Sequence, residues 1–292
     1  MPETTNAEIA FVNAGESLPG SNGDPSVIHF DTGGGQFDQH HLGDVETSSA
    51  ALLAEKLSVA QDPGLKELLL MVKRTDNVRP VEHTNLHYLI EGYPRLKKFQ
   101  TEGRIDWGKV QERIFDDFDI IYGQETQRTQ SRRDLQKYAR WTILPNELKV
   151  ATILWHPELR EAAFERGADV VLWTRAKGRN KFYVGIQRHR KLKGLLSLRG
   201  VAVNLRAAEA SIREIKVRRE NLGYVGREGP VSNWLLHQSF GLVASGTKSW
   251  KLESDEYTKI HPQDLTTFTC VPLSAIPADQ IGKWRRQEPR AT

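Results

Sequence analysis

Residues 27–41 read VIHFDTGGGQFDQHH, and this stretch decides how the first part of the chain is interpreted. The apolar residues before Asp31 are typical of a short buried strand, and three consecutive glycines cannot continue a regular element without an entropic cost. We therefore predict a sharp turn at the end of a strand, where open α/β sheets place their ligand sites. After this turn the sequence supplies Asp38, His40 and His41.

Aspartate and histidine side chains bind divalent cations and move protons, so these residues form a candidate metal centre. If the segment is extended, alternation places Asp38 and His40 on one face and His41 on the other. The alternative is a polar surface turn whose histidines bind nothing. A motif this short does not by itself decide between the two interpretations.

The composition is that of a soluble globular protein, with 292 residues of which 38% are hydrophobic and 27% are charged. No apolar run approaches the ~20 residues that span a bilayer, so we expect no membrane association. The start of the chain, MPETTNAEIAFVNAG, lacks the basic and apolar regions of a signal peptide. Cys270 is the single cysteine, which excludes an intrachain disulfide and favours a cytoplasmic location.

Charge is distributed unevenly along the chain. Residues 1–62 carry ten acidic side chains and one basic side chain, a net charge of −9, whereas residues 63–292 carry 27 acidic and 40 basic side chains, a net charge of +13. This division suits a metal site that acts on a polyanion, because carboxylates hold the cation while lysines and arginines neutralise substrate phosphates. The basic residues of any one run can equally form a solvated surface.

The sequence after His41 contains two helix starts. Residues 48–57, SSAALLAEKL, predict a short helix whose small first residues let it pack close to the turn that carries Asp38 and His40. Asp62-Pro63 starts a second helix, which leads to Asp76. That aspartate is either a further metal ligand or a helix-end cap. His83 and His87 have the spacing of a helical metal pair but lack the glutamate of the zinc-protease pattern.

The remaining elements follow from apolar periodicity. Strands are expected at 7–13, 27–30, 150–155, 168–174, 180–187 and 234–237. Further helices are expected at 106–122, 157–167 and 204–220, and residues 124–138 suit an exposed helix or a hinge. We therefore predict a metal-site domain at 1–123, a connecting segment at 124–145 and a substrate-binding domain at 146–292.

Three segments resemble the DHH phosphoesterase superfamily, and most nearly its melanocyte-proliferating-gene branch of metal-dependent RNA exonucleases. They are Asp31-Thr-Gly-Gly34, Phe37-Asp-Gln-His40 and Asp76-Asn77. LLHQSFG, which contains His237, is similar to the branch's His-x-Ser-Gly-Phe segment. Gln39 stands where the family has the first histidine of its pair. The family's first metal motif has no counterpart, as expected if the start is trimmed or the lineage lost part of its centre.

The resemblance and the element order imply an α/β protein of two lobes. An N-terminal DHH-like lobe with a mainly parallel sheet and flanking helices is joined by a long helix to a smaller C-terminal α/β lobe. The resemblance implies one or two Mn²⁺ or Mg²⁺ ions, with Asp38 and His40 catalytic. The implied metal ligands are Asp31, Asp38, His40, His41 and Asp76. The implied substrate-binding residues are His237, Ser239, Gly246 and Thr247, extended by a basic track of Arg188, Arg190, Lys191 and Lys193.

The expected function is metal-dependent hydrolysis of nucleic acid or nucleotide phosphodiesters, in the manner of a phosphoesterase or exonuclease. The alternative is a non-catalytic relative that binds nucleic acid or nucleotide through its basic lobe. A third hypothesis is a structural or partner-binding protein with neither property. The chain has seven tryptophans, and tryptophan is enriched at protein–protein interfaces. Expected partners are RNA or another nucleic acid or nucleotide, and a second copy of the chain in a homodimer.

Overall fold

The structure is a computed structural model of the 292-residue chain. It describes residues 8–10, 12–13, 16–21, 24, 26–32, 35–40, 47–77, 86–178, 181–246, 252–253 and 256–281, without the side chains of residues 76, 77, 86 and 87. The chain divides into two compact units, Met1–Thr129 and Gln130–Thr292. The second unit spans more residues than the first, so the prediction of a smaller C-terminal lobe is wrong.

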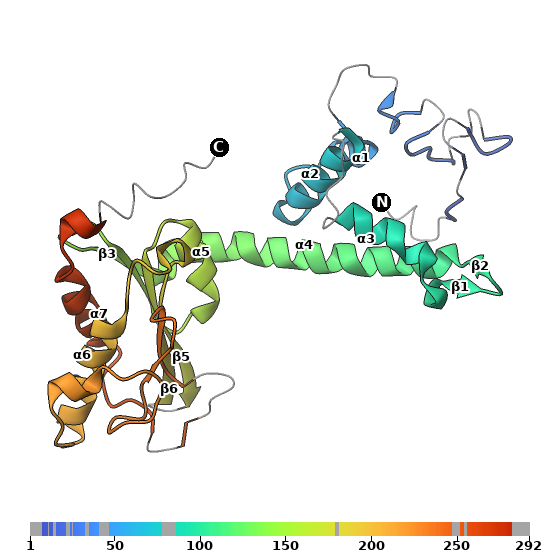
Figure 1. The fold of residues 1–292 in the computed structure, drawn as a ribbon. Coiled ribbons are helices and arrows are strands. Elements are labelled where there is room, and N and C mark those ends of the chain that lie inside the picture. The colour runs from blue at the N-terminus through green and yellow to red at the C-terminus, as the bar shows by residue number, and fades with distance from the viewer. Residues whose placement is uncertain are drawn as a thin grey trace. The chain divides into compact units, whose positions relative to one another are not determined.

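A long helix, α4 (Trp107–Tyr138), runs from the first unit into the second. The predicted two-lobed α/β architecture with a long joining helix is therefore confirmed (Figure 1). The polar residues after Tyr122 continue the helix, because they favour helix and form pairs one turn apart, such as Gln130 Nε2 donating to Asp134 Oδ2 at 3.0 Å. No helix in the described ranges combines the length and apolar character needed to cross a bilayer.

The second unit is built on a mixed six-stranded sheet. In spatial order its strands are β3 (Ala139–Ile143), β4 (Lys149–Ile153), β5 (Val170–Gly178), β6 (Lys181–Arg188), β8 (Leu242–Ser245) and β7 (Leu235–Leu236). The β4–β5 pair is parallel and the other pairs are antiparallel. Helix α5 (Arg160–Glu165) lies between the parallel strands in sequence, as the sequence predicts.

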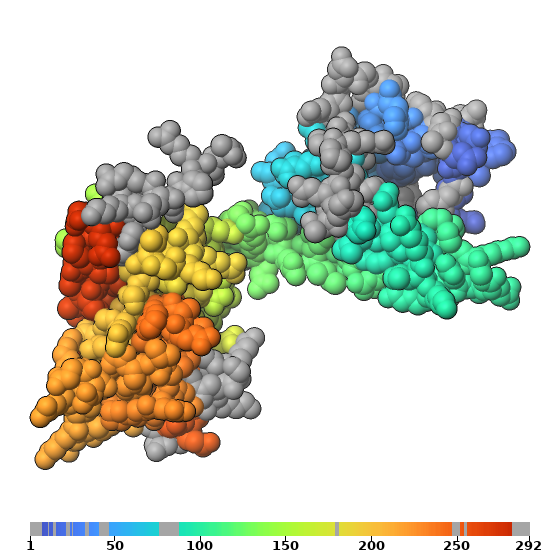
Figure 2. Space-filling model, viewed as in Figure 1, coloured from blue at the N-terminus to red at the C-terminus, as the bar shows by residue number. Residues whose placement is uncertain are grey.

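Helices cover both faces of this sheet (Figure 1). On one face Val150 and Leu172 pack with side chains of α6 (Arg199–Ile212) and α7 (Leu265–Ser274). On the other face Ala151 and Val171 pack with α5 and with Leu135 of α4. Adjacent strand residues therefore point to opposite helical layers. The space-filling view shows α7 packed against the segment that carries α6 (Figure 2).

Helix α6 begins five residues before the predicted start at 204 and ends at Ile212 rather than at 220. A short 3₁₀ helix, η7 (Arg219–Leu222), follows it. Arg206 of α6 is fully buried, although arginine is ordinarily a surface residue. Its guanidinium donates hydrogen bonds to four main-chain carbonyls of the loop wrapped around it, those of Leu222, Tyr224, Gly226 and Trp234. A guanidinium can be buried when its donors are satisfied in this way.

The first unit contains α1 (Ser49–Lys56), α2 (Pro63–Asn77) and α3 (Leu86–Gly92). It also contains two 3₁₀ turns, η3 (Tyr93–Arg95) and η4 (Lys97–Phe99), and the hairpin β1 (Gln100–Thr101) to β2 (Arg104–Ile105). The predicted helix starts are confirmed. The Ser48 side chain accepts a hydrogen bond from the Ala51 N–H at 3.3 Å, and Asp62 Oδ1 accepts one from the Gly64 N–H at 2.8 Å.

The mainly parallel sheet predicted for the first lobe is not formed by the residues described there. Phe30 makes an isolated parallel bridge to Phe37, and their rings stack with centroids 5.2 Å apart. Next to this bridge, Asp31 N donates to Phe37 O at 3.0 Å. The strand expected at 27–30 therefore pairs locally. The described part of 7–13 forms no strand.

Candidate metal centre

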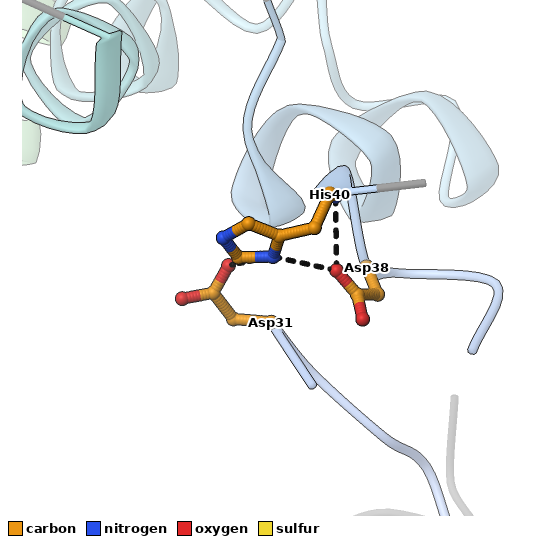
Figure 3. A group of neighbouring side chains, drawn as sticks. All are labelled: Asp31, Asp38 and His40. Carbon is orange, nitrogen blue, oxygen red and sulfur yellow. Dashed lines mark hydrogen bonds and ion pairs between the residues drawn. The ribbon is translucent and has the colours of Figure 1, made fainter. Parts of the chain in front are cut away.

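The structure brings Asp31, Asp38 and His40 together, as Figure 3 shows. One potential ligand atom from each lies within 4.8 Å of the others. Asp31 has a φ of +56°, a conformation that a residue other than glycine rarely adopts. The Asp31 N–H donates to Phe37 O at 3.0 Å, so Asp38 and His40, which follow Phe37, lie close to Asp31.

Asp38 is the organising residue of the group. Its side chain is buried, whereas those of Asp31 and His40 are 59% and 68% exposed. Oδ1 of Asp38 accepts the main-chain N–H of His40 at 3.0 Å and lies 2.7 Å from Nδ1 of the same residue. Nδ1 lies 3.8 Å from Oδ1 of Asp31. The imidazole is therefore held between two carboxylates, one fixed and buried and one open to solvent.

Gln39 takes part in the site through hydrogen bonds to its neighbours. Its Nε2 donates to Oδ1 of Asp31 at 2.7 Å, and its Oε1 accepts from the Ser49 hydroxyl at 2.5 Å. The same hydroxyl lies 3.3 Å from Oδ1 of Asp31. Ser49 is the first residue of α1, so the predicted close packing of small residues against the turn is confirmed. Its hydrogen bonds to the site residues were not predicted, because a helix-start serine ordinarily caps its own helix.

The donor set fits a divalent cation. Two carboxylates and an imidazole are ligand types that Mn²⁺ accepts, and carboxylates suit Mg²⁺ as well. These three side chains would fill about half of an octahedral shell, leaving room for water or substrate oxygens. Of the other predicted ligands, His41 lies outside the described residues. Asp76 lies at the end of α2, but its side chain is not among those described. His83 and the side chain of His87 also lie outside the described part of the chain.

The predicted substrate-binding residues belong to the second unit. His237 and Ser239 are exposed on the turn between β7 and β8. The Ser239 N–H donates to His237 Nδ1 at 3.1 Å, and the Ser239 hydroxyl lies 2.9 Å from the same nitrogen. Because Nδ1 is the acceptor, the proton of the neutral ring belongs on Nε2, which can donate to an anion. Thr247 lies outside the described residues.

The basic track is only partly exposed. Arg190 and Lys191, in the 3₁₀ helix η6 (Arg190–Leu192), and Lys193 after it face solvent. Arg188 was predicted to be part of this track, but its residue is 6% exposed, so it cannot contribute an exposed positive charge. Its place at the end of β6, under the turn that carries Ser239, explains the burial.

Arg188 instead holds the turn between β7 and β8, which carries His237 and Ser239, through hydrogen bonds. Nη2 donates to Ser239 O at 3.1 Å, and the Arg188 N–H donates to Gly241 O at 3.1 Å. A Cβ at Gly241 would lie 2.9 Å from the guanidinium, so any other residue there would have to displace it. Burial lowers the pKa of the Arg188 side chain, and Nε has no hydrogen-bond partner within the described part of the chain. Arg188 is therefore a positioning residue for His237 and Ser239.

Gly246 also has a packing role. Its φ is +77°, and a Cβ there would lie 2.2 Å from Cδ1 of Tyr183. The resemblance implies that Gly246 binds substrate, which stays a prediction; in the structure the glycine makes room for the Tyr183 ring. Sequence reasoning missed this contact because the partner lies on β6, more than sixty positions away.

No protein-family model and no curated protein match this chain. Among solved structures the chain is similar to the pGpG-specific phosphodiesterase PggH from Vibrio cholerae, with a TM-score of 0.22 and 10% sequence identity, over 66% of this chain and 78% of that chain. At this level of similarity the DHH resemblance stays a prediction.

Proposed function

We propose that the chain is a divalent-metal-dependent phosphoesterase that hydrolyses phosphodiester bonds of a nucleotide or nucleic acid. The supporting observation is the convergence of Asp31, Asp38 and His40, with the Asp38 carboxylate buried. A buried carboxylate is costly unless its charge is used or compensated. His40 and a cation would both compensate it.

Each residue has a distinct task in this proposal. Asp38 is held by two contacts to His40 and would be the fixed ligand, while Asp31, oriented by Gln39, would be the exposed one. A bound Mn²⁺ or Mg²⁺ would polarise the phosphoryl group and lower the pKa of a coordinated water. With Nδ1 of His40 directed at Asp38, Nε2 would serve as a ligand or would donate a proton to the leaving oxygen.

The second unit supplies groups suited to a phosphate-rich substrate. His237 and Ser239 on the turn supported by Arg188, together with exposed Arg190 and Lys191, would bind phosphate oxygens. The partner would therefore be RNA, another nucleic acid or a nucleotide. The excess of basic residues after position 62 supports this substrate class.

The test is hydrolysis of bis(p-nitrophenyl) phosphate and of a short RNA with Mn²⁺, with Mg²⁺ and after chelation. Asp38→Asn should lower the metal-dependent rate about 100-fold, the usual effect of removing one stabilising group. Asp24→Asn is the matched control, because Asp24 also accepts two local hydrogen bonds, from Ser26, but lies outside the cluster. No turnover with either ion, or equal rates for the two variants, would refute the proposal.

A second candidate function is binding without catalysis. It is favoured by Gln39, whose amide donates to the Asp31 oxygen that faces His40 and so competes with a cation for it. RNA binding that weakens steeply with salt, survives Asp38→Asn and is accompanied by no turnover would select this function. In that case Arg190→Gln should reduce the salt slope by about one unit.

A further inference from the structure

A separate pocket lies in the second unit, between α6, η7 and α7, and it has a volume of about 790 Å³. It uses no residue of the metal centre or of the 237–241 turn. Two arginines, Arg199 and Arg219, line it together with apolar side chains that include Val203, Val271 and Pro272. The packing of α7 against the α6 segment, visible in Figure 2, brings these groups together.

The Arg199 side chain is anchored to the main chain by one hydrogen bond. Its Nε donates to Gly223 O at 3.0 Å. A Cβ at Gly223 would lie 2.9 Å from Nε and 3.1 Å from Nη2, so the absence of a side chain there makes room for the guanidinium. One donor is used in this way, and the others have no partner among the residues that the structure describes. A guanidinium anchored through Nε can present its Nη groups to an oxyanion.

Arg219 is held by a relay that starts at a helix defect. Pro272 lies inside α7 and has no N–H, so Phe268 O loses its helical partner. Asn204 of α6 donates to this carbonyl through Nδ2 at 3.0 Å, and its Oδ1 accepts from Arg219 Nη2 at 3.0 Å. The carbonyl left free by Pro272 therefore holds the Asn204 side chain, and Asn204 in turn holds the Arg219 guanidinium.

The pocket has an excess of positive charge. Within the described ranges neither Arg199 nor Arg219 forms an ion pair, and the one carboxylate of the lining, Glu220, lies 4.0 Å from Nη1 of Arg218. Two guanidiniums match the charge of a phosphomonoester better than that of a carboxylate, because a phosphomonoester carries nearly two negative charges at pH 7. Val271, 58% exposed, and Pro272 offer an apolar wall for the body of the ligand.

We propose that this pocket binds a phosphomonoester with an apolar or aromatic body, the chemical class of the nucleoside monophosphates. The guanidiniums of Arg199 and Arg219 hold the phosphate, and the Val203, Val271 and Pro272 side chains contact the body. Since the site shares no residue with the metal centre, it serves as a ligand site whether or not the chain is a phosphoesterase.

The experiment measures binding to the full chain by calorimetry and ligand-observed NMR, without divalent metal. The probes are AMP, adenosine, phenyl phosphate and benzoate. AMP and phenyl phosphate should bind, and adenosine and benzoate should bind at least about tenfold more weakly. Benzoate binding as tightly as phenyl phosphate would show a carboxylate site and overturn the phosphate assignment. No binding of AMP or phenyl phosphate at millimolar concentration would overturn the site itself.

Variants locate the binding. Arg199→Gln with Arg219→Gln should weaken AMP binding at least about tenfold, whereas Lys216→Gln, at an exposed position outside the lining, should leave it unchanged. Gly223→Ala should weaken it without removing a charge, by displacing Arg199. Circular dichroism confirms that each variant folds. Full AMP affinity in the folded double variant would place the ligand elsewhere and refute the proposal.

Discussion

Nδ1 of His40 lies 2.7 Å from Oδ1 of Asp38, and the same oxygen accepts the main-chain N–H of His40 at 3.0 Å. The buried carboxylate and the exposed imidazole are two residues apart, so a local turn builds this contact without help from the rest of the fold. Only Asp31 is brought in from the other side of the glycine run. The candidate metal centre is therefore mainly a local structure, and its properties can be changed by single substitutions.

Gln39→His should tighten Mn²⁺ binding. Imidazole is a better ligand than a neutral amide, and the substitution removes the Gln39 amide that donates to Asp31 Oδ1. We expect the Kd for Mn²⁺ to fall about tenfold, which corresponds to about 1.4 kcal/mol. Calorimetric titration at pH 7.5 measures the change, with Gln36→His, an exposed position in the same segment, as the control. Equal Mn²⁺ affinity in the wild type and both variants would contradict the metal assignment.

Gly241→Ala should loosen the turn that carries His237 and Ser239. The added methyl would lie 2.9 Å from the buried Arg188 guanidinium, and such overpacking costs about 1–3 kcal/mol of unfolding free energy. RNA binding should weaken as well, because the turn moves. Gly123→Ala is the opposite control, since Gly123 lies inside α4 with open space around it and the change should stabilise by about 0.5–1 kcal/mol. Denaturant unfolding measures both, and a neutral Gly241→Ala would exclude the support role of Arg188.

Arg206→Met should destabilise the second unit. The guanidinium is fully buried, its Nη1 donates to Leu222 O at 2.8 Å, and its Cζ lies 3.6 Å from the centre of the Tyr224 ring. Removing it leaves carbonyls without donors, so we expect a loss of about 3 kcal/mol or more of unfolding free energy. Arg218→Met, at an exposed position, should change it by less than about 0.5 kcal/mol. Similar urea midpoints for the two variants would argue against this anchoring role.

Cys270 should be a slow thiol. Partial burial raises its pKa above the ordinary value of 9.0, so the reactive thiolate forms only at higher pH in the folded chain. The pKa of Cys270 is higher in the folded chain than in the unfolded chain. The neutral thiol therefore contributes to the free energy of unfolding below the unfolded pKa, and this contribution is lost as pH rises through the folded pKa. Alkylation by iodoacetamide, followed from pH 7 to 10, should show its midpoint at higher pH in the folded chain than in urea. Coincident profiles would contradict this expectation.

The sequence by itself determined the central strands of the six-stranded sheet in the second unit. Strands β4, β5 and β6 are apolar runs bounded by turn residues, and such patterns depend on neighbours along the chain. Helix starts at Ser48 and Asp62 were equally visible, because a cap hydrogen-bonds within three residues. The pairing of Asp38 with His40 belongs to the same class, since it is made within one turn.

Tertiary structure decided what depends on distant partners. Arg206 and Arg188 look like surface cations in the sequence, but both are buried. Carbonyl groups from residues 222–234 accept the hydrogen bonds of Arg206, and Ser239 O accepts one from Arg188. Ser49 joins the metal centre only because α1 packs against the glycine turn, and Gly246 is required by the Tyr183 ring. A charged or small residue carries no local signal of such a role. Its burial is favourable only when the fold supplies the matching donors, acceptors or space.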